Sequence, residues 1–356
     1  MKQKIKAGII GASGYSGEQL VKLLLRHPGV ELTSVTSRQY AGKSLHDVFP
    51  AIHTRPGLVF SEPDPARIAA ECDAVFLALP HGVAAPFAVP LLRAGKRVFD
   101  LSADFRLKSA EVYRDFYAHE HPAPELLAES VYGLPEVYRK EIAGARLIAC
   151  PGCYPTSILL PSIPLIRSGL VNLTGIIADS SSGVSGAGRK ADVDYLFVEC
   201  NESVRAYGLP RHRHLSEIEQ ELNRAAGFPT PPLVMNFTPH LVPTNRGILS
   251  TLYFDLSPKA RQQLTESPET LSATVREVFA QAYTGEPFVR LLTGDRLPDT
   301  KNVTGTNFIE FAFRIDPRTG KLIVVSAEDN ILKGASGQAV QCFNIVHGFE
   351  ETAGLL

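Results

Sequence analysis

The stretch that most constrains the fold is an apolar run that leads into three evenly spaced glycines. Residues 5–10 have the composition of a buried strand, Gly11-Ala12-Ser13-Gly14-Tyr15-Ser16-Gly17 follows, and apolar residues then recur over 20–24 with a helical period. A strand, a glycine loop and a helix in this order are typical of dinucleotide-binding units, because glycines let the backbone approach a pyrophosphate at the helix N-terminus. The spacing is G-x-x-G-x-x-G, not the commoner G-x-G-x-x-G, and a purely structural turn is the alternative. We expect nucleotide contacts from Gly11, Ser13, Gly14, Tyr15, Ser16 and Gly17.

The end of the next apolar run indicates which dinucleotide fits. Residues 31–36 read as a strand, and Ser37-Arg38 follows it. An NAD site usually places Asp or Glu here to bind the ribose 2′-hydroxyl, whereas a hydroxyl and a cation suit a 2′-phosphate. The sequence therefore favours NADP(H), selected by Ser37 and Arg38, and the alternative is that Arg38 is only a solvated loop cation.

Further strands alternate with helices through the first half of the chain. Residues 73–79 end in Pro80-His81-Gly82, and residues 97–101 end in Ser102-Ala103-Asp104-Phe105-Arg106. This alternation predicts an α/β fold with a Rossmann-type doubly wound parallel sheet, whose ligands bind beyond the carboxyl ends of the strands. We expect Pro80 to contact the nucleotide and Arg106 the substrate. His81, Asp104 and Arg106 are equally compatible with loop capping or surface pairing.

A cysteine stands at the start of a predicted helix. The strand-like residues 145–150 lead into Pro151-Gly152-Cys153-Tyr154-Pro155, and an apolar helical run covers 157–166. Pro155 fits the first turn of a helix, where the unpaired N–H groups and the dipole favour an anion. A thiol in this place loses its proton more easily and becomes a nucleophile, and a buried structural cysteine is the alternative. Cys150 and Cys153 also form C-x-x-C, but no second pair follows to suggest zinc or redox chemistry.

The second half of the chain changes its pattern. Residues 175–179, 232–242, 247–256, 307–315 and 322–327 read as strands, with helices at about 214–226 and 267–283. Hairpins mixed with a few helices predict an α+β domain with helices on one face of its sheet. We therefore expect a nucleotide-binding domain over 1–149, completed by a C-terminal helix within 330–356, and a catalytic and oligomerisation domain over 150–329.

Two polar stretches of the second half are candidates for binding and catalysis. Residues 180–190 are predicted to form a small-residue loop ending in Arg189-Lys190, whose N–H groups and guanidinium suit an oxyanion; a flexible linker is the alternative. Arg211-His212-Arg213-His214 precedes a helix and reads as a solvated face, a general base or a metal pair, but no third ligand is nearby, so no metal is predicted. We expect Ser182 and Arg189 to bind substrate, and Gly183 and Asn330 to contact the cofactor.

Composition excludes several classes of function. The 356 residues are 44% hydrophobic and 21% charged, as in a globular enzyme, and the net charge of −1 suggests neither a nucleic-acid nor a membrane partner. No apolar run reaches the length of a membrane span, and no signal sequence precedes the first strand. Five cysteines without a disulfide framework indicate a reducing cytoplasm.

Together these features fit hydride transfer to an acyl-cysteine. A thiolate displaces phosphate from an activated acid to give a thioester, hydride reduces it, and a base and oxyanion donors assist. The chain resembles the longer type of the N-acetyl-gamma-glutamyl-phosphate reductase family of arginine biosynthesis and, more distantly, the aspartate-semialdehyde dehydrogenases. The resemblance spans the chain and rests on the glycine loop, Leu101-Ser102-Ala103-Asp104-Phe105-Arg106, Tyr132-Gly133-Leu134-Pro135-Glu136, Pro151-Gly152-Cys153-Tyr154-Pro155-Thr156, the 183–189 loop, and His212-Arg213-His214 with Glu217-Ile218.

The resemblance implies Cys153 as nucleophile, a histidine of the pair as acid/base, NADPH, and a cytoplasmic homodimer or homotetramer acting on a small acyl phosphate. Ser216 replaces a proline common in the family, with no effect on the chemistry. We expect His214 to be the acid/base, because it lies nearer the helix N-terminus, and His212 to bind the substrate carboxylate or phosphate. The alternatives are a reductase of aspartyl or carrier-bound aminoadipyl phosphate, and a nucleotide-sensing protein without catalysis.

Overall fold

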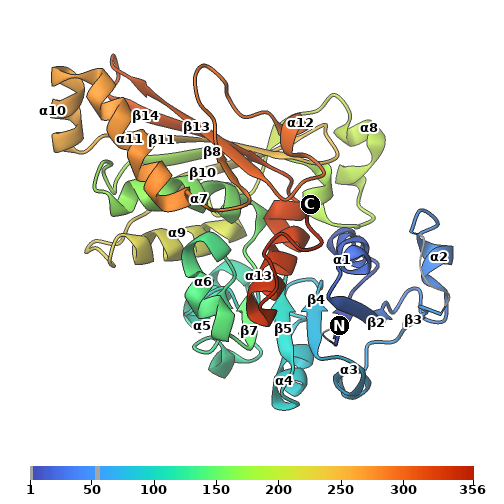
Figure 1. The fold of residues 1–356 in the computed structure, drawn as a ribbon. Helices are drawn as coiled ribbons and strands as arrows, with labels where there is room; N and C mark the ends of the chain where they lie inside the picture. The colour runs from blue at the N-terminus through green and yellow to red at the C-terminus, as the bar shows by residue number, and fades with distance from the viewer. Residues whose placement is uncertain (1–2, 53–56) are drawn as a thin grey trace. The chain divides into compact units, whose positions relative to one another are not determined.

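The computed structural model describes residues 3–52 and 57–356 (Figure 1). The chain divides into two compact units. Unit 1 contains the residues up to Gly152 together with Ala335–Leu356, and unit 2 is Cys153–Gly334. The chain therefore enters unit 2 at the candidate nucleophile and leaves it at a glycine. Each unit is built around one seven-stranded sheet.

The sheet of unit 1 is parallel throughout, in the order β3-β2-β1-β4-β5-β7-β6. The strand order reverses beside β1, which is where a doubly wound sheet opens a crevice for a ligand. Its strands are β1 (Ile5–Ile10), β2 (Val30–Thr36), β3 (Phe60–Ser61), β4 (Ala74–Leu77), β5 (Arg97–Asp100), β6 (Val131–Tyr132) and β7 (Leu147–Ala149). Its helices are α1 (Tyr15–Arg26), α2 (Leu45–Val48), α3 (Pro65–Glu71), α4 (Ala85–Arg93), α5 (Ala110–Tyr117), α6 (Pro135–Gly144) and α13 (Gly337–His347).

The central strands of unit 1 are buried on both faces, which is why they read as continuous apolar runs. On one face Phe76 and Phe99 stack with ring centroids 4.9 Å apart, and Phe343 of α13 packs 5.7 Å from each. On the other face Val75 and Val98 join the core formed with α3 and α4. The C-terminal helix α13 thus belongs to the core of unit 1, where it packs against α1 and α6.

The sheet of unit 2 mixes parallel and antiparallel pairs in the order β12-β13-β14-β11-β8-β10-β9. Its strands are β8 (Ile176–Gly183), β9 (Arg205–Ala206), β10 (Met235–Val242), β11 (Ile248–Asp255), β12 (Val289–Leu291), β13 (Ile309–Asp316) and β14 (Lys321–Glu328). Its helices are α7 (Cys153–Arg167), α8 (Phe197–Cys200), α9 (Arg213–Ala225), α10 (Pro258–Glu266), α11 (Pro268–Tyr283) and α12 (Thr300–Val303). The predicted fold class, a doubly wound parallel sheet with a second α+β domain, is confirmed.

Helix α7 lies along one face of the second sheet and is buried from Tyr154 to Ile166. Hydroxyl groups satisfy each other beneath it: Ser157 and Ser180 each lie 2.7 Å from Ser250, and Ser326 donates to the Ser157 carbonyl at 2.7 Å. Helices α9 and α11 pack against α7 on the same side. The alternate residues of the strands are partly exposed on the opposite face.

The predicted loop over 180–190 is wrong in its first part. Residues 180–183 complete β8, which lies inside the sheet between β10 and β11 and is hydrogen-bonded on both sides. Ser180 and Ser182 are buried strand residues there, and the Ser180 hydroxyl pairs with that of Ser250, whereas Ser181 is partly exposed. Only the segment after Gly183 turns, through a 3₁₀ helix at Val184–Ala187. Across residues 3–52 and 57–356, no helix is long and apolar enough to cross a membrane.

Candidate active site

Cys153 is the first residue of the fifteen-residue helix α7. Its side chain is partly exposed, whereas Cys72, Cys150 and Cys342 are buried. Burial raises the pKa of the Cys72 and Cys150 thiols above their ordinary value, with desolvation as the largest cause in each. Of the two cysteines in the C-x-x-C pair, the one at the helix N-terminus is therefore the one placed to act as a thiolate.

The two candidate histidines lie together beside Tyr154, the residue that follows the cysteine. The Tyr154 ring centroid is 5.7 Å from that of His212 and 5.9 Å from that of His214, and the two imidazoles are 4.9 Å apart. The two imidazoles lie side by side although the residues are two positions apart, because α9 begins at Arg213 and His212 precedes it with an extended backbone.

His212 is the N-cap of α9. Its Nδ1 accepts a hydrogen bond of 3.1 Å from the His214 N–H, so the ring proton resides on Nε2. Burial, and to a lesser extent the Arg213 charge, lower the pKa of His212 to about 4. The imidazole is therefore neutral near pH 7 and presents an N–H donor. The His212 ring can therefore donate a hydrogen bond to a substrate oxygen, but it has no positive charge with which to attract an anion.

Two tyrosines outside the set of predicted site residues complete this cluster. The Tyr154 and Tyr207 hydroxyls are 2.9 Å apart, and both rings contact His212. The buried Ser182 hydroxyl bonds to the Tyr154 hydroxyl and to the Gly183 carbonyl, the latter at 3.1 Å. Tyr154 adjoins the cysteine in the sequence, which is a usable signal, but nothing local marks Tyr207.

The segment after β8 carries the other predicted substrate and cofactor residues of unit 2. Gly183 donates to the Gly247 carbonyl at 2.9 Å, and a Cβ on Gly183 would lie 2.8 Å from the Arg246 nitrogen, so only glycine fits. Arg189 is exposed after Gly188, whose φ is +78°. The Asn330 side chain is buried and engaged by protein groups: Oδ1 accepts from the Gly247 N–H at 2.9 Å, and Nδ2 donates to the Ser185 hydroxyl at 3.0 Å. The cofactor contact expected of Asn330 stays a prediction.

The glycine loop of unit 1 has the geometry of a nucleotide cradle. Gly11 has a φ of +87°, and a Cβ there would lie 2.3 Å from the Ala78 carbonyl oxygen, while a Cβ on Gly17 would lie 2.3 Å from the Gly11 oxygen. Gly14 is the N-cap of α1 and has no side chain that could cap the helix itself. These features leave the helix start accessible to a phosphate, so the residues present fit a dinucleotide.

The residues predicted to select the 2′-phosphate lie where β2 ends. The Ser37 hydroxyl is 2.9 Å from the Ser13 hydroxyl, which links the strand end to the glycine loop. Arg38 is exposed, and among the described residues it forms no hydrogen bond or ion pair. The cation therefore remains available to an incoming anion. Pro80 is exposed three residues beyond the end of β4.

Polar residues at the ends of β4 and β5 organise loops. Asp104 is fully buried and accepts from the Gly82 and Ala84 N–H groups at 2.6 and 2.9 Å and from the Tyr113 hydroxyl at 3.0 Å, which is the loop-capping alternative. Arg106 is buried too, and it donates to the Cys150 carbonyl at 2.8 Å and the Leu101 carbonyl at 3.0 Å. Arg106 thus fixes the backbone three residues before Cys153, and its contact with substrate stays a prediction.

The chain matches both domains of one protein family. "Semialdehyde dehydrogenase, NAD binding domain" matches residues 6–145, and "Semialdehyde dehydrogenase, dimerisation domain" matches residues 153–330. Aspartate semialdehyde dehydrogenase II from Vibrio cholerae, complexed with ASA, has the same fold, with a TM-score of 0.72 and 17% identity over 98% of this chain and 99% of its own. The Candida albicans aspartate semialdehyde dehydrogenase with NADP gives 0.70 and 17% over 96% and 98%. The fold and both matches define the class as semialdehyde dehydrogenases.

Curated relatives narrow the class further. The N-acetyl-gamma-glutamyl-phosphate reductase of Akkermansia muciniphila is 54% identical over 100% of this chain and 99% of its own length. Proteins of the same name from Geotalea daltonii and Heliobacterium modesticaldum are 49% and 46% identical over 99% of this chain and 98% of theirs. The chain belongs to the N-acetyl-gamma-glutamyl-phosphate reductase family, as its motifs indicated.

Proposed function

We propose that this chain catalyses the NADPH-dependent reduction of N-acetyl-gamma-glutamyl phosphate to N-acetylglutamate semialdehyde and phosphate, a step of arginine biosynthesis. Besides family membership, the observation that carries the proposal is the position of Cys153, partly exposed at the first residue of α7 in the unit that also holds His212 and His214. Alcohol dehydrogenation needs no such thiol, whereas reduction of an activated acid does.

In this proposal the reaction begins at the Cys153 sulfur. His214 takes the thiol proton, and the thiolate attacks the γ-carbonyl carbon of the substrate. The carbon–oxygen bond to phosphate breaks, phosphate leaves with the proton that His214 took from the thiol, and a thioester remains on Cys153. NADPH, when bound, supplies the hydride that reduces this thioester to the aldehyde level. The carbon–sulfur bond then breaks, the semialdehyde leaves, and the thiolate is regenerated.

The neutral His212 has a distinct part in this scheme. Its Nε2–H donates to a substrate oxygen, because Nδ1 already accepts from the His214 N–H. This arrangement prevents His212 from taking the thiol proton while its capping bond holds, so the acid/base role falls to His214. Arg106, Ser182 and Arg189 are the further proposed contacts for the substrate anion.

Unit 1 is proposed to bind the cofactor and unit 2 to carry catalysis and oligomerisation. The cofactor is NADP(H), held at the glycine loop and at the start of α1, with Ser37 and Arg38 reading the 2′-phosphate. We place the enzyme in the cytoplasm, in keeping with its cysteines.

A homodimer or homotetramer is proposed to assemble through the second sheet. On the face away from α7, Ile177, Tyr253 and Ile323 stand in one row across three adjacent strands. Asp179, Thr251 and Val325 form the next row. A broad sheet face with partly exposed apolar residues is suited to a second copy of the same face, because an isologous contact repeats the same patch on both subunits.

The test is turnover in the oxidative direction. Purified protein with N-acetylglutamate semialdehyde, phosphate and NADP should form NADPH, with little product from aspartate semialdehyde. Cys153→Ser should lose at least 10³-fold in turnover, because a hydroxyl is a much weaker nucleophile, while NADP affinity stays within twofold. Cys150→Ser is the matched control and should remain active. An active Cys153→Ser, or a preference for another semialdehyde, would refute the proposal.

A further inference from the structure

The backbone at Gly334 packs directly against Cys153. A Cβ built on Gly334 would lie 2.7 Å from the Cys153 Cβ, 3.1 Å from its Cα and 2.9 Å from Oε1 of Glu328. Real Cβ atoms do not approach other atoms so closely, so the absence of a side chain at 334 is a steric requirement of the place that Cys153 occupies. The backbone of Gly334 thus packs against one side of Cys153 and limits where its side chain can lie.

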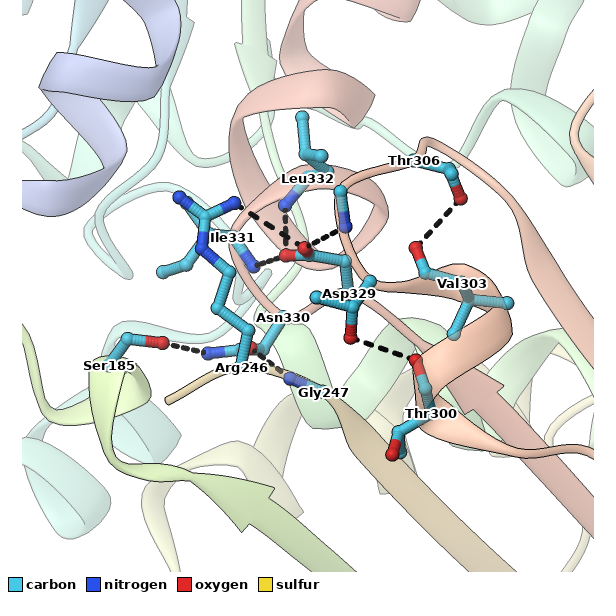
Figure 2. A network of polar contacts seen from close by, with 12 residues as sticks. Ser185, Arg246, Gly247, Thr300, Val303, Thr306, Asp329, Asn330, Ile331 and Leu332 are labelled. Atoms are coloured by element: carbon cyan, nitrogen blue, oxygen red, sulfur yellow. Dashed lines mark hydrogen bonds and ion pairs between the residues drawn. The ribbon is translucent and has the colours of Figure 1, made fainter. Parts of the chain in front are cut away.

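Gly334 is in turn held by Asp329, the residue after β14. The Gly334 N–H donates to the Asp329 carbonyl at 3.0 Å. The fully buried Asp329 carboxylate accepts from the Ile331 and Leu332 N–H groups at 2.8 and 3.0 Å (Figure 2), which closes the turn that leads to Gly334. Its second oxygen accepts from the Gly305 N–H at 2.8 Å and from Arg246 at 3.4 Å.

Asn330 extends the same network toward the segment that follows β8. Its side chain bridges the Gly247 N–H and the Ser185 hydroxyl, as Figure 2 shows. Ser185 lies in the 3₁₀ turn after Gly183, between Ser182 and Arg189, which are proposed to bind the substrate anion. Asp329 and Asn330 therefore hold two parts of the unit in place: the backbone at Gly334, which packs against Cys153, and the 3₁₀ turn that contains Ser185.

We propose that Asp329 and Asn330 are positioning residues for the reaction, which fix Cys153, through Gly334, relative to the segment 183–188. The inference rests on the proposed role of Cys153. Neither side chain touches the reacting atoms. Their effect arises because an attacking sulfur and an anion site must be aligned within a fraction of an ångström, and a displacement of about 1 Å can cost a hundredfold in rate.

The test separates positioning from folding by measuring four quantities on each variant. These are kcat and KM in the oxidative direction, the rate of Cys153 alkylation by iodoacetamide, and the thermal midpoint. Asp329→Asn retains shape but removes a carboxylate oxygen that accepts from Gly305 and Arg246. We expect kcat to fall at least tenfold and the alkylation rate to change at least threefold, with KM within threefold of wild type.

Gly334→Ala is the second variant, and it adds a methyl group against Cys153. It should lower kcat at least tenfold and change the alkylation rate. Gly144→Ala is its matched control, because a Cβ there meets nothing within 4 Å, and it should behave as wild type. The inference would be overturned if both test variants kept the wild-type kcat per folded molecule and only their thermal midpoints were lowered. Failure of the proposed function would be recognised separately, by an active Cys153→Ser.

Discussion

At the residue scale, the candidate site combines Cys153 at the start of α7 with a cluster of Tyr154, Tyr207, His212 and His214. Cys153 is marked by local features, the preceding Pro-Gly turn and Pro155 within the first helical turn, which depend on short-range backbone preferences. The cluster of Tyr154, Tyr207 and His212 depends on the packing of α7 against α9. That contact cannot be predicted from the spacing of residues in the sequence. The same limitation applies to Asn330, whose side chain is satisfied by groups more than eighty residues away.

The two histidines should respond differently to replacement. His214→Asn should slow iodoacetamide alkylation of Cys153 at neutral pH and lower turnover about 10²-fold or more, since the thiol loses its base. His212→Asn should leave the alkylation rate nearly unchanged while KM rises. The measurement is alkylation rate and turnover between pH 5 and 8.

The pH profile supplies the control for that experiment. Because the pKa of His212 is about 4, the ring stays neutral over this whole range, and its removal should not shift the profile. A reversed pattern, with His212→Asn slowing alkylation, would exchange the two roles. No effect from either variant would show that neither histidine is the base.

At the element scale, strand–loop–helix units were predicted well, because their signals are contiguous. Residues 5–24 fold as β1, the glycine loop and α1 in the predicted order. The small residues at 180–183, three serines and a glycine, were wrongly predicted to form a loop, since small polar residues are typical of loops. The burial of this segment depends on the neighbouring strands β10 and β11, contributed by residues more than fifty positions later. It also depends on Ser250, whose hydroxyl lies 2.7 Å from those of both Ser180 and Ser157.

Alanine substitutions at two glycines of the nucleotide loop should have different effects, one on stability and the other on NADP affinity. A Cβ on Gly17 would overlap the Gly11 carbonyl, so Gly17→Ala should lower the free energy of unfolding by about 2 kcal/mol or more. Gly14 has a φ of −73° and its Cβ would lie 3.8 Å from the nearest atom, so Gly14→Ala should keep its stability. The methyl group would nevertheless face the proposed pyrophosphate, and NADP affinity should fall at least tenfold. Urea unfolding and NADP titration measure both; unchanged NADP affinity in Gly14→Ala would contradict the cradle.

At the scale of the whole molecule, the two-sheet architecture follows from the change of pattern after α7, from single strands between helices to hairpins. The mixed order of the second sheet, with β8 at its interior, was not predictable, because the pairing of distant strands leaves no local signal.

The assembly can be tested on the open face of the second sheet. Tyr253→Asp should introduce a charge between Ile177 and Ile323 and shift the protein to monomers, as measured by sedimentation velocity at micromolar concentration. Leu297→Glu is the control, since Leu297 is an exposed apolar residue outside the sheet strands, and it should leave the assembly intact. An assembly that resists Tyr253→Asp would place the subunit contact elsewhere.

The packing of Gly334 on Cys153 has a consequence for the ancestry of the chain. These residues are the last and the first of unit 2, so the unit is an insert whose two ends meet. A module with adjoining ends can be spliced into a loop of a host with little cost in loop closure, and removed again without pulling the host apart. The junction of such an exchange would fall at the peptide bond before Cys153. Whatever host receives the module would acquire the nucleophile as the first residue after the splice.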